Sequence, residues 1–423
     1  MFDHGTRIMK RHSTSKLFLL LALAIGLPAL AGGRYAVAPT GQTACYGADG
    51  HVMACALRGA ALSGQDAQHA TTTLRYRDNG DGTVSDLNTG LMWQQATPAK
   101  LTWAEAHAGA RTLRLGGKSD WRLPNIKELY SLMDFSGVTV GMNGRAIGGM
   151  AAKPYLDSRV FDFRYGDASA GERPIDAQYW SATEYTGRTM GGHETVFGVN
   201  FADGRIKGYP KYVPWNRSQG QRMFVRYVRG NPDYGKNDFA DNGDGTVTDR
   251  ATGLIWMQAD SGALKAGRQS DGSMDWPQAL AWASGLDYAG HKDWRLPNAK
   301  ELQSIVDYSR SPQTTGSPAI GPLFKSTPIR DEAGRPDYAS YWTSTSHLDG
   351  PRPGSAAVYI SFGSSLGFMR RHGGGEATLM DVHGAGAQRS DPKQGDPAAF
   401  PAGRGPQGDV IRIYNMVRLV RGG

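Results

Sequence analysis

The chain repeats one short motif. The pentapeptide Trp-Arg-Leu-Pro-Asn stands at 121–125 and again at 294–298, and each copy is followed, one residue later, by Lys-Glu. Internal repetition constrains the fold strongly, because both copies are expected to adopt the same structure. Solenoid repeats recur every ~20–50 residues, whereas these copies lie about a domain apart. The spacing therefore predicts that a whole domain has been duplicated within the 423 residues.

Four further motifs accompany the pentapeptide, in the same order in both halves of the chain. They are Asp-Asn-Gly-Asp-Gly-Thr-Val at 78–84 and 241–247, Thr-Gly-Leu-x-Trp at 89–93 and 252–256, Tyr-Trp at 179–180 and 341–342, and Val-Arg-x-Val-Arg-Gly at 225–230 and 417–422. The shared order predicts a first repeat over residues 71–230 and a second over 236–423. A loop insertion rich in glycine, proline and charge is expected in the second repeat at about 370–409.

The pentapeptide is expected to join a strand to a helix. Its proline disfavours helix in the residue before it, and its asparagine forms a capping box with the glutamate three residues later. The tryptophan is expected in the core, and the arginine is expected to pair with a nearby carboxylate or carbonyl; a ligand role is the less favoured alternative. The residues given these structural roles are Trp121, Arg122, Asn125 and Glu128, with Trp294, Arg295, Asn298 and Glu301 in the second copy.

The remaining local patterns are those of a mixed fold. Asn-Gly and Asp-Gly steps between strand-forming residues predict a β-hairpin in each copy, and Thr102 and Asp275 each cap a further helix. Three short alternating segments between 178 and 229, with counterparts in the second copy, predict strands. Residues 135–177 form a long loop, a type that is usually functional or mobile. The expected fold class is α+β: two tandem domains, each with a small antiparallel sheet, two helices and long loops.

Residues 1–31 have the pattern of a secretory signal peptide: a basic start, an apolar run from Leu17 to Leu30 and small residues at the end. A membrane anchor is the alternative, but the run is shorter than the ~20 apolar residues that span a bilayer, and Gly26 and Pro28 interrupt it. The mature chain is therefore expected to be exported, to the periplasm or the cell exterior, without membrane insertion.

Residues 32–70 are expected to form an irregular leader that packs on, or hangs from, the first repeat. Both cysteines of the chain, Cys45 and Cys55, lie in this leader. In an exported protein they are expected to form one disulfide, and two unpaired thiols are the alternative. No Cys-x₂-Cys pattern is present, which disfavours a zinc site.

The net charge indicates only a mild preference for anionic partners. The formal charge is +8, of which residues 1–31 contribute +3 from four basic residues and Asp3, so +5 remains after signal removal. This charge is too low to indicate a nucleic-acid-binding protein.

No cofactor or catalytic residue is assigned from the sequence. His-Glu-x-x-His and phosphate-binding Gly-x-x-x-x-Gly-Lys-Ser/Thr motifs are both missing. Asp78, Asp81 and Asp86 suggest calcium, but an EF-hand register would place Arg77 at the first ligand position and Asn88 at the twelfth. A plain turn is therefore favoured over a calcium site.

Basic and aromatic residues gather at corresponding places in the two copies and are candidates for an anion-binding rim. Ordinary surface charge is the alternative. The candidates are Trp215, Arg217 and Arg222 in the first copy and Arg370, Arg371, His372, His383 and Arg389 in the second. Asp381 with His372 and His383 would also provide metal-ligand types, but a solvated loop with scattered histidines is favoured.

The ordered motifs together resemble the Lcl C-terminal domain family, a bacterial domain of unknown function, in two tandem copies. This family looks like a relative of the C-type-lectin-like fold, which is shared with formylglycine-generating enzymes. Its namesake member is implicated in adhesion through sulfated glycosaminoglycans, so the resemblance implies binding of surface polysaccharide. The chemistry of formylglycine-generating enzymes depends on interior cysteines, and neither repeat contains a cysteine.

The function expected from these features is that of an exported, non-catalytic protein that binds anionic polysaccharide. Duplication favours binding of a polymer, because two weak sites on one chain gain avidity. Arginines beside exposed aromatic rings suit sulfated or carboxylated sugars. The first alternative is a structural envelope protein that binds other proteins, and an enzyme of unknown chemistry is a less favoured one.

Overall fold

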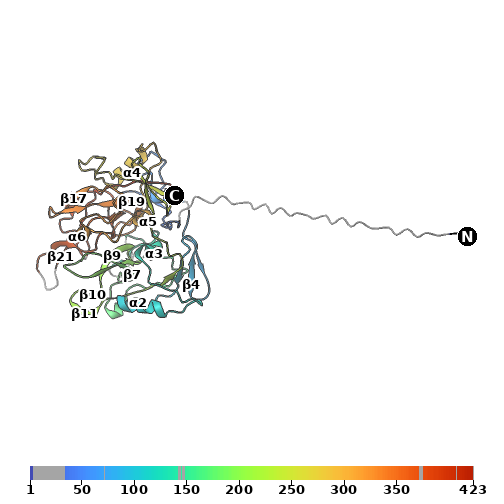
Figure 1. The fold of residues 1–423 in the computed structure, drawn as a ribbon. Helices are drawn as coiled ribbons and strands as arrows, with labels where there is room; N and C mark the ends of the chain where they lie inside the picture. Colours follow the sequence, from blue (N-terminus) through green and yellow to red (C-terminus); the bar gives the residue numbers. More distant parts are fainter. Residues whose placement is uncertain are drawn as a thin grey trace. The chain divides into compact units, whose positions relative to one another are not determined.

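The computed structural model describes residues 1–2, 34–70, 72–141, 144, 148–370, 375–405 and 407–422 (Figure 1). The chain divides into two units, Met1–Ala31 and Gly32–Gly423, and the elements below all belong to the second. The expected signal peptide lies almost wholly outside the described residues. In the described part of the chain, no helix has the length and apolar character needed to cross a membrane.

Short strands and short helices make up the second unit. The leader contains β1 (Cys45–Tyr46), β2 (Val52–Met53) and α1 (Asp66–His69). The first repeat contains β3 (Tyr76–Asp78), β4 (Thr83–Asp86), β5 (Met92–Gln94), β6 (Leu101–Thr102), α2 (Trp103–Thr112), α3 (Ile126–Ser131), the 3₁₀ helix η1 (Ala168–Ala170), β7 (Gln178–Glu184), β8 (Thr195–Asn200), β9 (Arg205–Pro210), β10 (Tyr212–Val213), β11 (Asn216–Gly220), β12 (Arg222–Met223) and β13 (Val228–Arg229).

The second repeat contains β14 (Phe239–Asp241), β15 (Thr246–Asp249), β16 (Leu254–Met257), α4 (Trp276–Gly285), α5 (Ala299–Ser304), α6 (Pro312–Thr315), β17 (Pro328–Arg330), β18 (Pro336–Tyr338), β19 (Ser340–His347), β20 (Ala356–Ser361), β21 (Leu366–Met369), β22 (Thr378–Asp381), β23 (Gln388–Pro392), the 3₁₀ helix η2 (Pro397–Ala399) and β24 (Val420–Arg421). The chain is thus α+β with small antiparallel sheets and few helices, as the sequence predicts.

Each repeat opens and closes in the same four-stranded sheet, ordered β13-β5-β4-β3 in the first and β14-β15-β16-β24 in the second. The expected hairpins are present, and Gly80 and Gly82 take the positive φ that the first turn requires. The Asp78 carboxylate accepts a hydrogen bond from the backbone N–H of Gly80, and Asp81 accepts one from Thr83. These aspartates therefore stabilise the turn itself.

The repeated pentapeptide does join an extended segment to a helix. Asn125 caps α3 and Asn298 caps α5, each with a complete capping box. The guanidinium of Arg295 binds both carboxylate oxygens of Glu301 at 2.7 Å, and Arg122 binds Glu128 in the same way. The tryptophan and the leucine of the pentapeptide are buried in both copies. In both copies the motif therefore buries its tryptophan and leucine and pairs its arginine with the glutamate of the capping box.

The two repeats share one six-stranded sheet, which the sequence does not reveal. Its order is β19-β20-β23-β9-β8-β7, so the third strand of each half meets its counterpart at the centre. The central strands β9 and β23 are antiparallel, with Gln388 opposite Ile206. The two halves are therefore arranged with approximate twofold symmetry about this junction.

The lysine after each pentapeptide fastens the two repeats together in a reciprocal way. Lys127 Nζ donates to the Ser304 carbonyl of α5 at 2.6 Å, and Lys300 Nζ donates to the Ser131 carbonyl of α3 at 2.7 Å. Both lysines also bind the chain that precedes the opposite repeat. A residue type that repeats in the sequence thus forms the same contact twice across the repeat interface.

The leader packs mainly on the second repeat, which differs from the expected association with the first. Gln42 binds the Ser346 backbone on β19, and Thr345 donates to the Asp66 carboxylate at the start of α1. A disulfide joins Cys45, the first residue of β1, to Cys55, which follows β2. The sequence of the leader does not show that it packs against β19, because Thr345 on that strand is 279 residues away from Asp66.

The stretch at 370–409 is not simply a loop inserted between strands. It contains β22 and η2, and also β23, which pairs with β20 and completes the second half of the shared sheet. Some of the residues that suggested an insertion, such as Arg389, Asp391 and Pro392, lie within β23 itself. Conversely, the closing strands predicted over 224–229 and 417–421 are only two residues long, β13 and β24. Outside β13, Phe224 makes an isolated bridge to Tyr179.

Candidate functional site

A cavity of about 690 Å³ lies over the junction where β9 meets β23. Residues of the first repeat's long loop, such as Thr139 and Asp176, line one side, and Arg404 and Asp409 of the second repeat line another. The long loop expected at residues 135–177 therefore borders a cavity. Its volume is within the range of ordinary small-ligand sites.

Side chains alternate between the two faces of β9, and this alternation places charged residues on the floor of the cavity. Arg205, Lys207 and Tyr209 alternate along β9 on the cavity side, while Ile206 between them is fully buried in the core. Because Gln388 is opposite Ile206, Arg389 comes next to Arg205 on the same face. Like charges on facing strand positions are unfavourable unless something compensates for them.

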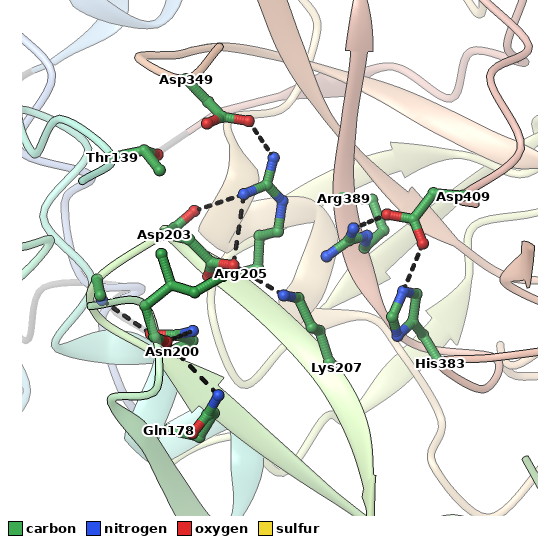
Figure 2. A network of polar contacts seen from close by, with 12 residues as sticks. Thr139, Gln178, Asn200, Asp203, Arg205, Lys207, Asp349, His383, Arg389 and Asp409 are labelled. Atoms are coloured by element: carbon green, nitrogen blue, oxygen red, sulfur yellow. Dashed lines mark hydrogen bonds and ion pairs between the residues drawn. The ribbon is translucent and has the colours of Figure 1, made fainter. Parts of the chain in front are cut away.

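Three carboxylates compensate these cations within the protein (Figure 2). Asp203 accepts from Lys207 Nζ at 2.7 Å and lies 3.5 Å from Arg205, and Arg205 also pairs with Asp349 of the second repeat. Figure 2 shows this group facing a second one in which Arg389 is paired with Asp409. Both repeats thus contribute charged groups to one site.

The pKa values show how strongly the cations on the floor are desolvated. Burial lowers the pKa of Lys207 to about 8, although Asp203 acts in the opposite direction. Burial and the nearby charge of Arg205 lower the pKa of Arg389 to about 10. Burial alone would raise the pKa of Asp203, but the charges of Lys207 and Arg205 outweigh it and lower that pKa. The charged forms of the cations are therefore held at a cost that a bound anion would reduce.

Several polar atoms on the floor have no hydrogen-bond partner among the described residues. They are Nε and Nη1 of Arg389, Nε of Arg205, Oη of Tyr209 and Oδ1 of Asp203. Arg389 is 6% exposed and Asp203 is 3% exposed, so bulk water does not satisfy these groups. Buried polar groups are nearly always hydrogen-bonded, so each exception calls for an explanation such as a bound water or ion.

Three of the predicted rim residues line the cavity. Trp215, in the turn between β10 and β11, is 68% exposed, and the side chain of Arg222 on β12 is 54% exposed where it pairs with Glu105. Arg389 belongs to the floor rather than the rim. The structure thus brings together residues that the sequence placed in separate repeats.

The other predicted residues do not line it. Arg217 projects from β11 and Arg370 follows β21, both exposed and outside the lining. Arg371 and His372 lie outside the described residues. His383 is buried rather than solvated, and its Nε2 contacts Asp409 at 2.8 Å. Burial and the charge of Arg389 lower the pKa of His383 far below its usual value, so it is a neutral hydrogen-bonding group.

Asp381 is the carboxylate that the sequence offered as a metal ligand together with His383. The structure directs its carboxylate to the hydroxyl of Tyr185 at 2.9 Å and to the backbone N–H of Gly384. No group of three or more His, Cys, Asp or Glu side chains suited to a metal occurs among the described residues.

Most floor residues were missed by reasoning from the sequence. Arg205, Lys207 and Tyr209 alternate with Ile206 and Gly208 directly after an Asp-Gly turn, which is a local strand signal that was available. Asp349 and Asp409 carry no such signal, because they lie in loops and reach the site only through the fold.

The cavity also borders a serine–histidine pair. The ring Nδ1 of His347 lies 2.7 Å from Ser390 Oγ, and its Nε2 lies 3.0 Å from the backbone oxygen of Asp203. Ser390 lines the cavity, while His347 is fully buried beneath it. Burial, together with the charge of Arg205, lowers the pKa of His347 to about 3.

Comparison with known proteins assigns the repeats to a family. A family model described as the Lcl C-terminal domain matches residues 82–229 and 245–378, well over half of the chain. No curated protein matches the sequence, and no solved structure matches it either. Arg205 and Lys207 lie within the first matched stretch, and Arg389 and Asp409 lie beyond the second. The chain belongs to the Lcl C-terminal domain family and carries that domain in two tandem copies.

Proposed function

We propose that this protein is a non-catalytic binding protein for anionic polysaccharide, and that the polymer binds across the inter-repeat cavity. The observation that carries this proposal is the charge of the lining. Seven cationic residues line the cavity against five acidic ones: Lys100, Arg173, Arg205, Lys207, Arg222, Arg389 and Arg404 against Glu172, Asp176, Asp203, Asp349 and Asp409. The lining thus carries an excess of positive charge.

The rim suits an extended ligand better than a small ion. Trp215 presents an aromatic surface of the kind on which sugar rings stack, and Arg222 lies exposed on the same rim. Exposed arginines bind sulfate and carboxylate groups through charge-assisted hydrogen bonds. A polymer that passes over Trp215 and Arg222 can therefore place one of its anionic groups on the floor.

A binding role also fits the chemistry of the Ser390–His347 pair. A general base works best when its pKa is near the working pH. A histidine whose pKa is about 3 takes a proton from serine too weakly to act as such a base. The pair therefore supports a positioning role, in which His347 holds Ser390 beside Arg205.

We also propose that the mature chain is exported and acts in the periplasm or outside the cell. The proposal rests on the signal-like pattern of residues 1–31 and on the disulfide between Cys45 and Cys55, a type of bond that persists in oxidising compartments.

The test is binding of the mature chain to anionic and neutral polysaccharides at increasing salt. We expect micromolar or weaker dissociation constants for the anionic polymers, a steep loss of affinity with salt, and no binding of neutral polymers. Arg222→Gln with Arg404→Gln removes two cationic charges from the lining of the cavity and is expected to weaken binding about tenfold.

The matched control is Arg217→Gln with Arg370→Gln, which removes the same charge from two exposed residues outside the lining. This control is expected to bind almost as the wild type does. Equal losses in the two double variants would mean that charge alone is sensed, and absence of binding to every anionic polymer would contradict the proposal and favour a protein partner.

A further inference from the structure

The leader binds one particular face of the second repeat, which is formed by β19, the start of α4 and the residue after β23. The side-chain amide of Gln42 donates to the carbonyl of Ser346 at 2.9 Å and accepts from its N–H at 2.8 Å. Nζ of Lys393 donates to the carbonyls of Tyr46 and Gly47 at 3.1 and 3.3 Å. Because these hydrogen bonds all involve backbone atoms, this face is suited to bind a polypeptide segment.

The internal duplication gives the first repeat a copy of this face. Thr183 on β7 stands where Thr345 stands on β19, and each hydroxyl oxygen accepts from the first backbone N–H of the helix after the pentapeptide, at 3.0 Å. Trp103 begins α2 as Trp276 begins α4, and each ring N–H donates to a carbonyl of the neighbouring strand. The two faces are therefore built alike.

A lysine lies over the tryptophan in both copies. Nζ of Lys393 is 4.1 Å from the centre of the Trp276 ring, and Nζ of Lys211 is 4.5 Å from the centre of the Trp103 ring. Each lysine directly follows the proline that ends a strand of the shared sheet, β23 or β9. The cation that binds the carbonyls of the leader in the second repeat therefore has a counterpart in the first.

The two faces differ in whether a segment covers them. Three side chains of the second repeat are fully buried where the leader docks, and their counterparts in the first repeat are partly exposed: Thr345, Trp276 and Lys393 against Thr183, Trp103 and Lys211. In the first repeat, Lys211 pairs with Glu184, whose side chain is 52% exposed. An exposed ion pair contributes little to stability, so a docking segment can displace it at low cost.

We propose that this open face, formed by Trp103, His107, Thr183, Glu184 and Lys211, is a docking site for a polypeptide segment of another protein. The segment has the chemistry of the leader: it presents backbone carbonyls to Lys211 and a carboxylate or amide side chain to Thr183. The leader of the same chain cannot fill the open face while it lies on the second repeat. The site is separate from the inter-repeat cavity and does not depend on polysaccharide binding.

Two positions of the open face differ from the face that the leader covers, and they predict its affinity. His107 stands where the second repeat has Leu280, a member of the apolar cluster against which Leu62 of the leader packs. Glu184 stands where the second repeat has Ser346. The open face is therefore expected to bind a leader-like segment more weakly than the second repeat does, because it offers less apolar contact and its lysine is already paired.

The test is calorimetric titration of the mature chain, residues 32–423, with a synthetic peptide of residues 34–70 whose disulfide is closed. We expect one peptide to bind per chain. Lys211→Gln is expected to weaken binding about tenfold, because it removes the cation that binds carbonyls. Arg217→Gln removes the same charge from β11, outside the open face, and is the matched control; it is expected to bind as the wild type does.

A variant that strengthens binding locates the peptide independently. His107→Leu with Glu184→Ser gives the open face the residues of the second repeat at both differing positions, and it is expected to bind the peptide about tenfold more tightly than the wild type. No binding of the peptide would overturn the proposal. Affinities unchanged by both sets of substitutions would also overturn it, because the peptide would then be exchanging with the leader on the second repeat.

Sedimentation of the mature chain alone identifies the source of the segment. We expect no self-association, because each leader stays on its own second repeat. Self-association that Lys211→Gln abolishes and Arg217→Gln does not would show that the segment comes from a second copy of the chain, and the proposal of a different protein as partner would then be wrong.

Discussion

At the scale of single residues, the repeated arginines serve the fold and the unrepeated ones form the site. Arg226 and Arg418 hold the same place in the closing motif, and both are fully buried. Arg226 donates to the carbonyls of Gln94 and Gln95, and Arg418 donates in the same way in the second repeat. Among the described residues, Nε lacks a partner in Arg226 and Arg418, whereas both Nε and Nη1 lack one in Arg389. The two repeated arginines therefore make more hydrogen bonds to the fold than Arg389 does, although none of the three is fully satisfied.

Asp66 provides a prediction about pH. Burial raises the pKa of Asp66 to about 6, against 3.8 for an ordinary aspartate. A carboxyl group whose folded pKa is raised contributes stability that is complete below pH 4 and is lost as the pH rises through 6. Asp66→Asn keeps an acceptor for the hydroxyl of Thr345 but cannot ionise. It is expected to exceed the wild type in stability by at most about 3 kcal/mol at pH 7.5 and to equal it at pH 4.

The measurement is urea unfolding of both proteins between pH 4 and pH 8, expressed as the difference in the free energy of unfolding. Taking the difference cancels every other titrating group, provided that it behaves alike in both proteins. A difference that does not change with pH would show that Asp66 is not desolvated by the contact of α1 with β19.

At the scale of elements, the strand-to-helix junctions depend on how deeply their arginine–glutamate pair is buried. Glu301 in α5 and Glu105 in α2 both complete capping boxes. The side chains of Arg295 and Glu301 are 13% and 9% exposed, whereas the pair of Glu105 with Arg222 is about half exposed on both sides. A buried charge left without its partner is far more costly than an exposed one.

Glutamine in place of each glutamate tests this difference, because glutamine preserves the capping box and removes only the charge. Glu301→Gln is expected to lower the free energy of unfolding by about 3 kcal/mol, since it leaves the guanidinium of Arg295 buried without a counter-charge. Glu105→Gln is expected to leave stability close to that of the wild type. Chemical denaturation of the two variants checks this ranking, and equal stabilities would refute it.

These junctions were predictable from sequence because all of their determinants lie within eight residues: the proline, the capping asparagine, the glutamate and the arginine that binds it. The candidate site was not, because it depends on the pairing of Ile206 with Gln388, about 180 residues apart. Nothing local to β23 shows that it completes a sheet begun by β19 and β20. Arg389 and Arg222 were identified only as basic residues, and their different burial followed from the shared sheet.

At the scale of the whole molecule, the two duplicated domains are not structurally independent of each other. They share the six-stranded sheet, the reciprocal lysines Lys127 and Lys300, and the main apolar cluster, to which both contribute, while each repeat also has a smaller apolar cluster of its own. Phe197 on β8 packs against Tyr308 of the second repeat, with ring centroids 4.9 Å apart. Because the candidate site lies on this same junction, the geometry of the site depends on the two repeats remaining docked.

Cooperative unfolding of the two repeats is the consequence that can be measured. If the smaller cluster of each repeat were enough for it to unfold independently, calorimetry of residues 32–423 would give two transitions, or a calorimetric enthalpy about twice the van't Hoff enthalpy. We expect one transition with a ratio close to one, because separating the repeats would expose the core that both contribute to and break the β9–β23 pairing. Lys127→Met with Lys300→Met removes the reciprocal contacts and is expected to lower the midpoint and broaden the transition towards two steps. Two well-resolved transitions in the wild type would show that the repeats unfold independently, and an inter-repeat site would then lose its structural basis.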